Sequence, residues 1–297
     1  MKKLLFVSVL FLFGVSFAFG QFSFTSLDFP QGTLTTARGI NNSGQIVGAY
    51  RVNPPRHAMF IDHAQYLPLG SGTLLDILYS EAFKINSRGD IVGQFIGDDG
   101  FTHGFLWRKG VITILDFPGA SDTTPFGIND SGTVVGSWDI LDADGNVLAY
   151  HGFVWKDGGF SEFNYPGSAD TTITGINARG EMVGLWDSDI TSPIGHGFIC
   201  KGDACSSFDV PVAGVIVTQP NDINARGDIV GAYIDADNVT HGFRIHANNF
   251  LKIDFPDAVR TLVWGINAAG QMVGTYYDYA GAPARGFLAE PENIGKP

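Results

Sequence analysis

The sequence carries little charge, and its charge is mostly of one sign. Charged residues make up 16 % of the 297 residues, and 18 Lys and Arg stand against 30 Asp and Glu, which gives a formal net charge of −12. Nucleic acids and anionic membrane surfaces need Lys and Arg to neutralise their phosphates. The composition therefore argues against nucleic acid as a partner.

The signatures of several enzyme classes and of helices are missing as well. The chain has no nucleophile elbow, no HExxH motif, no phosphate-binding loop and no dinucleotide fingerprint. After residue 20 no stretch keeps a helical periodicity of apolar residues. Low charge with 39 Gly and 24 Phe indicates an all-β protein with many tight turns.

Only two cysteines are present, Cys200 and Cys205, in the stretch HGFICKGDACSSF. They flank the turn KGDA, so we expect a disulfide across a hairpin rather than a metal site or a catalytic thiol. Aligned units place apolar pairs here, such as Trp107 and Val111. A covalent bond would thus replace an apolar cross-strand contact.

The first 20 residues predict a signal peptide. Lys2 and Lys3 precede an apolar run over residues 4–13, and the small residues Ala18 and Gly20 suit a cleavage site. No second hydrophobic span follows, so we expect no membrane insertion. The expected product is a secreted, extracellular or periplasmic chain, residues 21–297, forming one domain.

One motif, I-N-x-x-G-x-[IVM]-V-G, occurs six times at intervals of 43–48 residues. Its asparagines are Asn41, Asn86, Asn129, Asn177, Asn224 and Asn267. Each copy is followed by a His-Gly-Phe-like motif that begins at His57, His103, His151, His196, His241 and, in the sixth copy, Arg285. A DFP-like motif precedes most copies. The chain is therefore six repeat units of roughly 46 residues.

Each unit contains four short runs rich in Val, Ile, Phe and Thr, bounded by Gly, Asn and Asp, which is typical of strands. Four strands at this period predict a six-bladed β-propeller of four-stranded blades. The chain begins with a lone strand and ends one strand short. We expect residues 22–29 to pair with residues 286–290, which closes the ring and leaves no open sheet edge.

The repeat sequences resemble those of a known family. The strings DFPGASDTTPFGINDSGTVVGSW and HGFVWKDGGFSEFNYPG are similar to the extracellular HAF-repeat proteins. The resemblance covers all six units and implies an exported, propeller-like protein. It implies no particular reaction.

Residues that recur six times are expected to be scaffold, because an active site is needed once per protein. The Asn and Gly of INxxG suit tight turns. Each repeated His is expected to hydrogen-bond the polar residue of the adjacent DFP-like strand, namely Asp116, Asn164, Asp209 or Asp254. The alternatives are that the five repeated histidines together bind a metal, or that they transfer protons. Arg285 in the sixth slot favours a hydrogen-bond donor over a ligand.

Function is expected where the units differ. The residue that precedes the Gly of GIN varies and falls on the innermost strand: Arg38, Phe83, Phe126, Thr174, Asn221 and Trp264. Aromatic rings with Arg and amide groups suit a sugar-binding surface, in which rings stack and polar groups bind hydroxyls. Packing between blades is the alternative.

Two irregular segments complete the candidates. The stretch SGTLLDILYSE, residues 71–81, lengthens the second unit and could cover one mouth of the ring. The loop at 138–151 carries Asp139, Asp142 and Asp144, part of a calcium-loop pattern without its bidentate Glu. An acidic turn is the alternative to calcium, and no other cofactor is expected.

We therefore expect a secreted non-enzymatic propeller that binds an extracellular glycan, a cell-surface component or a protein. Two alternatives stay open: a hydrolase or lyase acting on an extracellular polysaccharide at the axial mouth, and a structural or adhesive envelope protein. Polar side chains that converge at the channel would discriminate between them. Carboxylates with His would favour the enzyme, and an aromatic and amide mixture would favour glycan binding.

Overall fold

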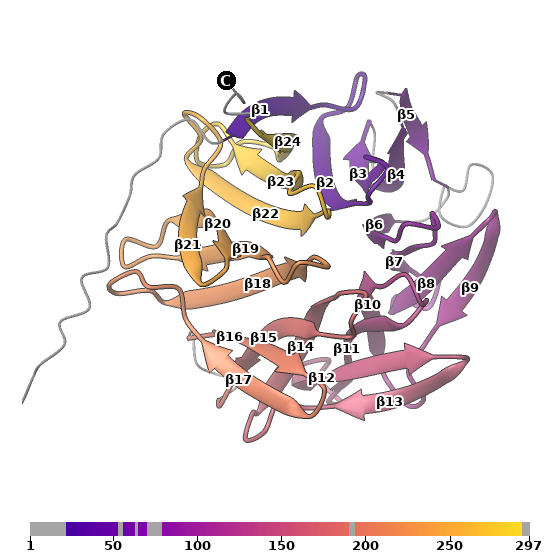
Figure 1. Ribbon diagram of the computed structural model, residues 1–297. Coiled ribbons are helices and arrows are strands. Elements are labelled where there is room, and N and C mark those ends of the chain that lie inside the picture. The colour runs from indigo at the N-terminus through magenta and orange to yellow at the C-terminus, as the bar shows by residue number, and fades with distance from the viewer. Residues whose placement is uncertain (1–21, 53–55, 63–64, 70–78, 190–193, 293–297) are drawn as a thin grey trace, which may run out of the picture.

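Six four-stranded antiparallel sheets surround a central axis (Figure 1). The computed structural model describes residues 22–52, 56–62, 65–69, 79–189 and 194–292. Each sheet is one blade, and the chain runs through the blades in order around the ring. The expected six-bladed propeller is confirmed.

The two inner strands of each blade are joined by the INxxG turn. The innermost strands are β2 (Leu34–Ile40), β6 (Ser80–Ile85), β10 (Asp122–Ile128), β14 (Asp170–Ile176), β18 (Val217–Ile223) and β22 (Arg260–Ile266). The second strands are β3 (Ile46–Arg51), β7 (Ile91–Ile96), β11 (Val134–Leu141), β15 (Met182–Asp187), β19 (Ile229–Ile234) and β23 (Met272–Tyr277).

The two outer strands of each blade follow. The third strands are β4 (His57–Asp62), β8 (Thr102–Arg108), β12 (Val147–Lys156), β16 (His196–Lys201), β20 (Thr240–His246) and β24 (Arg285–Pro291). The fourth strands are β5 (Gln65–Pro68), β9 (Val111–Leu115), β13 (Gly159–Phe163), β17 (Ala204–Phe208), β21 (Asn249–Ile253) and β1 (Phe22–Leu27).

The ring is closed by strands from the two ends of the described chain. β1 pairs antiparallel with β24 along its whole length, from Phe22 opposite Pro291 to Leu27 opposite Gly286. The ring of Phe24 lies 5.7 Å from that of Phe255, which adds an apolar contact to the ladder. The pairing expected from the complementary ends is confirmed, and it places the N-terminal strand as the outer strand of the sixth blade.

The core of each blade contains a fully buried side chain from the third strand. The third residue of the His-Gly-Phe-like motif is fully buried in all six units, as Met59, Phe105, Phe153, Phe198, Phe243 and Phe287. The residue opposite it on the second strand is glycine, as Gly136 is opposite Phe153, because a larger side chain would clash there. A Cβ on Gly136 would lie 2.7 Å from the Phe153 ring and 2.1 Å from the carbonyl oxygen of Thr124.

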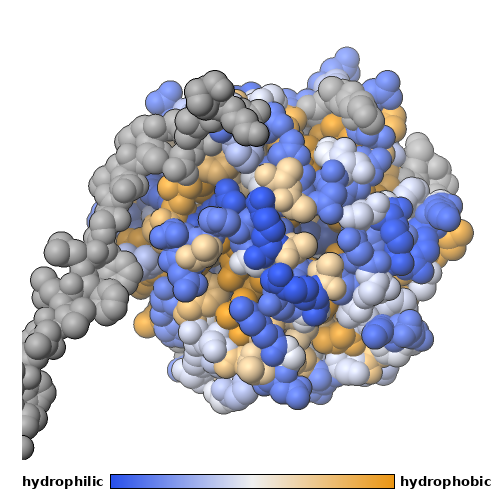
Figure 2. Space-filling model, viewed as in Figure 1, coloured by the Kyte–Doolittle hydropathy of each residue, from blue (hydrophilic) through white to orange (hydrophobic). Residues whose placement is uncertain are grey.

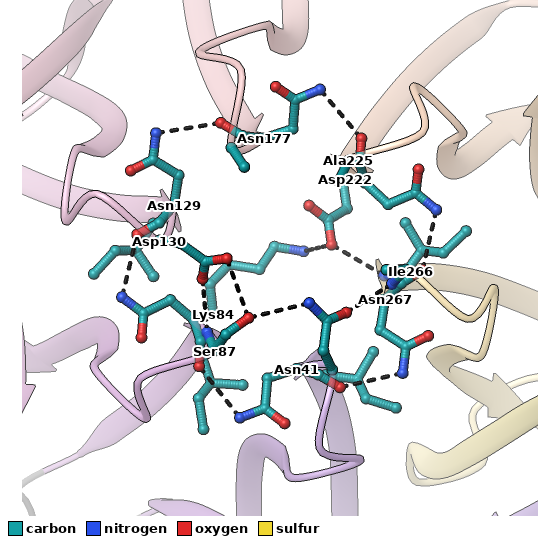
Figure 3. Close-up of a pocket in the computed structure, with 18 of the residues that line it drawn as sticks. Asn41, Lys84, Ser87, Asn129, Asp130, Asn177, Asp222, Ala225, Ile266 and Asn267 are labelled. Carbon is teal, nitrogen blue, oxygen red and sulfur yellow. Dashed lines mark hydrogen bonds and ion pairs between the residues drawn. The ribbon is translucent and has the colours of Figure 1, made fainter.

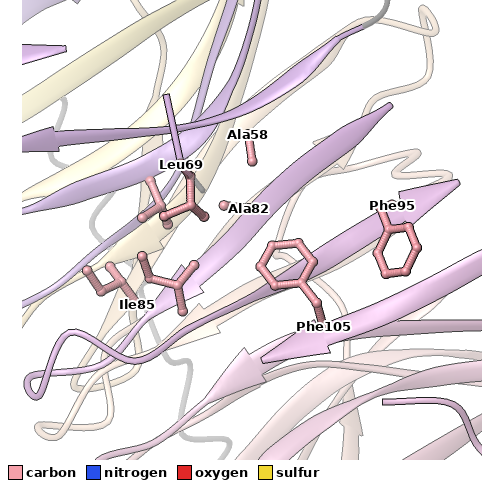
Figure 4. Close-up of a cluster of buried hydrophobic side chains, with 8 residues drawn as sticks. Ala58, Leu69, Ala82, Ile85, Phe95 and Phe105 are labelled. Carbon is pink, nitrogen blue, oxygen red and sulfur yellow. The ribbon is translucent and has the colours of Figure 1, made fainter. Parts of the chain in front are cut away.

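Apolar side chains also fill the spaces between blades. Figure 4 shows one such cluster, in which Phe105 and Phe95 of the second blade join Leu69 and Ala58 of the first. Because every blade repeats the same apolar alternation, the same kind of contact recurs around the ring.

The disulfide predicted between Cys200 and Cys205 is confirmed. The two residues are directly opposite on β16 and β17, with their Cα atoms 4.1 Å apart. The expected equivalent pair in the second blade was wrong by one residue, since Trp107 lies opposite Ile112 and not Val111. The two-residue turn at Lys109 and Gly110, both with positive φ, sets that register.

Two predicted segments lie outside the described residues: the signal peptide at 1–20, and most of the stretch at 71–81 that was expected to cover one mouth of the ring. Among the described ranges, no helix is long and apolar enough to cross a membrane.

Candidate functional site

The repeated asparagines shape the turns at one end of the central channel. In each turn the side-chain oxygen of Asn accepts hydrogen bonds from two backbone N–H groups. For Asn129 the donors are Ser131, at 3.1 Å, and Thr133, at 3.0 Å. The following Gly132 has a φ of 87°, a left-handed conformation that favours glycine. The Asn and Gly of the motif therefore act as turn residues.

The same asparagines also connect the six blades in a closed ring. Each side-chain nitrogen donates to the backbone carbonyl of the equivalent Asn in the next blade, at 3.0–3.2 Å. The last bond, from Asn267 to Asn41, joins the sixth blade to the first (Figure 3). Six turns thus hold one another in register around the axis.

A small cavity of about 80 Å³ lies inside this ring. Its lining includes Lys84, Asp222, the six asparagines and the isoleucine before each of them, Ile40, Ile85, Ile128, Ile176, Ile223 and Ile266. Figure 2 shows hydrophilic side chains gathered around a hollow at the centre of the molecule.

An ion pair crosses the centre of this cavity. Lys84 of β6 reaches Asp222 of β18, in the blade on the opposite side of the ring, with 3.1 Å between Nζ and Oδ2 (Figure 3). The Lys84 ammonium also donates to the carbonyl oxygen of Trp264 at 2.5 Å. Asp222 accepts the backbone N–H of Ile266 at 3.0 Å. Burial lowers the pKa of Lys84, against the raising influence of Asp222.

Sequence reasoning missed this pair, although a signal was present. Four units have glycine at this position, and backbones approach closely there: a Cβ on Gly39 would lie 2.9 Å from the Cα of Lys84. The second and fifth units read FKIN and NDIN in place of GIN. Opposite charges three units apart in a six-fold ring face each other across the axis.

The six predicted ligand-binding residues all lie on β-bulges of the innermost strands. In every blade the register between the first and second strand shifts at this residue, for example at Arg38, between Ala37 and Gly39. The other bulges hold Phe83, Phe126, Thr174, Asn221 and Trp264. A bulge re-aims its side chain, so the variable residues share a special position around the axis.

Several of these bulge residues contact one another. The guanidinium of Arg38 lies over the Trp264 ring, 3.9 Å from its centroid, and 5.6 Å from that of Phe83. Phe83 in turn contacts Phe126, with ring centroids 5.3 Å apart. The structure therefore brings Trp264, Arg38, Phe83 and Phe126 together in one connected row.

Burial divides the six residues into two groups. Phe83, Thr174 and Asn221 are buried, and the two polar ones bond the next blade: Thr174 donates to the carbonyl oxygen of Pro220 at 2.7 Å, and Asn221 to that of Val263 at 2.9 Å. Packing between blades accounts for these three. Arg38, Phe126 and Trp264 are partly exposed.

Two further charged residues adjoin Arg38, and the sequence analysis did not single them out. The buried carboxylate of Glu81 accepts from Arg38 Nε at 2.7 Å and from Arg56 Nη2 at 3.1 Å. Burial would raise the pKa of Glu81, but the charges of Arg38 and Arg56 hold it below its ordinary value. Glu81 and Arg56 each occur in one unit only, and that uniqueness was the available signal.

The repeated histidines lie on the third strands, away from the axis. Nδ1 of His103, His196 and His241 bonds the carboxylate of Asp116, Asp209 and Asp254, each at 2.9 Å, and His151 bonds Asn164 at 3.2 Å. Each of these rings also packs on an aromatic ring of the second strand. In the sixth slot Arg285 bonds Asp28. The expected hydrogen bond is wrong for His57, whose Nδ1 is buried without a partner among the described residues, although its ring packs on Tyr50. The contacts of the other histidines suit a structural role.

The loop with the partial calcium pattern is a compact acidic turn. Asp142 Oδ1 accepts the backbone N–H groups of Asp144, at 2.9 Å, and Asn146, at 2.8 Å. Asp139 lies on β11, where burial raises its pKa. Within the described part of the chain, no group of three or more His, Cys, Asp or Glu is arranged to hold a metal ion.

Comparison with known proteins gives the fold. No family model matches the chain, and no curated protein matches its sequence. A protein of unknown function from Dyadobacter fermentans is similar in structure, with a TM-score of 0.54 and 9 % identity over 92 % of this chain and 100 % of that one. The lectin of Aleuria aurantia, in complex with Fucα1-6GlcNAc, gives a TM-score of 0.52 with 10 % identity over 90 % of this chain and 99 % of that one.

An enzyme carries a similar domain. The acylaminoacyl peptidase of Pyrococcus horikoshii gives a TM-score of 0.54 with 12 % identity, covering 88 % of this chain but 46 % of the peptidase. A binding protein and an enzyme therefore both resemble this chain. At these identities the likeness shows the β-propeller fold alone.

Proposed function

We propose that this protein is an exported, non-enzymatic propeller that binds glycans through the partly exposed bulge residues Arg38, Phe126 and Trp264. The observation that carries the proposal is the convergence of aromatic and cationic side chains on the innermost bulges. The repeat units differ in chemistry at these positions. A sugar offers apolar ring faces and hydroxyl groups, which aromatic rings and N–H donors recognise together.

The charges around the axis favour binding over hydrolysis. Asp222 is paired with Lys84, and Glu81 with two arginines. A side chain that acts as general acid or base must reach the substrate, whereas these carboxylates are buried in ion pairs. The histidines bond residues on the outer part of each blade.

Two further observations support the proposal. The structurally similar Aleuria aurantia lectin shows that this fold can carry sugar binding. A disulfide between Cys200 and Cys205 is typical of proteins that leave the reducing cytoplasm, in agreement with the predicted signal peptide. The HAF-repeat resemblance points to the same location and remains a prediction.

A glycan array tests the proposal directly. The wild-type protein should bind a subset of glycans, and Trp264→Ala, Phe126→Ala and Arg38→Ala should each weaken that binding by about tenfold or more. Phe101→Ala is the matched control, because Phe101 is a 41 % exposed aromatic side chain on the loop between β7 and β8 and is not one of the bulge residues. Thermal unfolding of each variant separates lost binding from lost folding. Glycan binding that survives replacement of all three residues would reject this site.

A further inference from the structure

Arg38 is held in one orientation with most of its hydrogen-bond donors unused. Its Nε–H donates to Glu81 Oε1 at 2.7 Å, and its guanidinium stacks on Trp264 at 3.9 Å. An arginine carries five N–H donors in one plane. Within the described residues, Nη1 and Nη2 of Arg38 have no hydrogen-bond partner, while 19 % of the side chain is exposed. Four planar donors are therefore fixed in position beside solvent.

A second arginine converges on the same carboxylate oxygen. Arg56 Nη2 donates to Glu81 Oε1 at 3.1 Å and to Thr36 Oγ1 at 2.9 Å, and Nη1 lies 3.4 Å from the Tyr79 hydroxyl. The Nε of Arg56 is buried, with no partner among the described residues. Two guanidinium groups thus share one carboxylate.

The local charge is positive in a protein that is acidic overall. Lys84 and Asp222 neutralise each other at 3.1 Å, so Arg38, Arg56 and Glu81 leave one net positive charge near the axis. The whole chain carries a formal charge of −12. Glu81 neutralises only one of its two arginine partners, so one positive charge is left to attract an anion.

We propose that the axial site selects an acidic sugar, and that the Nη1 and Nη2 groups of Arg38 bind the carboxylate of a uronic acid residue. This inference rests on the glycan-binding function proposed above and names its ligand class. The planar guanidinium edge matches the two oxygens of a carboxylate, which gives a bidentate pair. The partly exposed Phe126 ring, which packs on Phe83 beside Arg38, supplies apolar contact for the sugar ring.

The arrangement explains why the site uses arginine instead of lysine. Stacking on Trp264 and the bond to Glu81 both use the flat guanidinium, and they remove rotamer freedom before the ligand arrives. A lysine ammonium is a point charge without this fork. Lower ordering cost on binding raises affinity.

Binding to defined oligosaccharides tests the inference. Isothermal titration would compare trigalacturonate with neutral galactotriose and with a sulfated galactose oligomer, each at 50 and 300 mM salt. We expect trigalacturonate to bind at least about tenfold more tightly than galactotriose, and its affinity to fall as salt screens the contact. Tighter binding of the sulfated oligomer would assign the site to sulfate esters and overturn the carboxylate assignment.

Variants of Arg38 separate charge from geometry. Arg38→Gln should abolish the preference for trigalacturonate, and Arg38→Lys should lose about tenfold in affinity although it keeps the charge. Arg260→Gln is the matched control, since Arg260 also lies over an aromatic ring, that of Tyr277 at 5.1 Å, but is the exposed first residue of β22. Trigalacturonate affinity in Arg260→Gln should equal that of the wild type.

The outcomes distinguish this inference from the proposed function. Binding of neutral glycans that depends on Trp264 but not on Arg38, with no preference for uronate, would overturn the acidic-sugar inference and leave glycan binding in place. Absence of binding to every oligosaccharide by a folded wild-type protein would overturn both. Equal affinity of Arg38→Lys and the wild type would reject the bidentate contact.

Discussion

The buried ion pair between Lys84 and Asp222 makes a sharp prediction about stability. The pair crosses the axis and joins blades that are not sequence neighbours, and both side chains are about nine-tenths buried. We consider three variants: Lys84→Gly, Asp222→Gly, and the double variant. Glycine is the natural reference, because four of the six units have it at this position.

The expected magnitudes follow from the geometry. Two charges 3.1 Å apart attract by roughly 5 kcal/mol at an effective dielectric constant of about 20. Removal of one partner leaves the other buried without compensation, which costs about 3–5 kcal/mol. The double variant removes both charges and restores the glycine ring, at about 0.5–1 kcal/mol for each added glycine. The coupling free energy between the two sites should therefore exceed about 2 kcal/mol.

Scanning calorimetry at pH 7 measures these effects. Each single variant should lower Tm by about 6–10 °C, and the double variant by no more than about 4 °C. Lys252→Ala serves as the control, because its ion pair with Asp254 at 2.9 Å is exposed and should contribute less than about 1 kcal/mol.

Asp222→Gly should also respond to pH. Burial already lowers the pKa of Lys84, and loss of the Asp222 charge lowers it further. The unpaired lysine then sheds its proton as pH rises, and the deficit relative to wild type should shrink between pH 7 and 10. Single variants that cost less than about 1 kcal/mol, or a double variant whose cost equals the sum of the singles, would refute the reasoning.

Three further predictions concern other contacts. Burial would raise the pKa of Asp228, but bonds from His246 and Asn224 and the charges of Arg244 and Arg226 lower it from 3.8 to about 2. These contacts should therefore add about 2 kcal/mol to the free energy of unfolding above pH 4, and this contribution is lost as pH falls toward 2. Asp228→Asn should remove this pH dependence from the urea midpoint. An unchanged acid response in the variant would contradict the prediction. Replacing both Cys200 and Cys205 by Ala should cost about 2 kcal/mol, from the six-residue loop that the disulfide closes, and reducing agent should then have no further effect on Tm. Asn129→Asp keeps the turn acceptor but removes the donor to the next blade, so we expect a loss of about 1–3 kcal/mol in urea unfolding; the same loss in the exposed Asn249→Asp would show that the ring bond is not the cause.

The repeat pattern predicted the architecture because each unit contains the residues that specify its own strands and turns. Alternating apolar residues define strands, and the Asn and Gly of the motif define the turn between the two inner strands. The complementary ends predicted the pairing of β1 with β24, since an open sheet edge is unfavourable. These features depend on contacts close in sequence or repeated in every unit.

The candidate site was predicted only in part. The varied position before GIN was identified, but the bulge that presents it and the division into buried and partly exposed residues were not predictable. Glu81 and Arg56 were missed, because their relation to Arg38 spans two blades and one loop. Spacing along one unit carries no information about which side chains of neighbouring units meet.

The repeat pattern was enough to predict six four-stranded blades, the closure of the ring, the disulfide and the turn role of the asparagines. The contacts at the axis became apparent only in the folded structure. There the fold joined the asparagines into a closed ring, paired Lys84 with Asp222 across the channel and stacked Arg38 on Trp264. All six units meet at the axis, so the contacts there depend on the curvature that closes the ring and not on any single repeat.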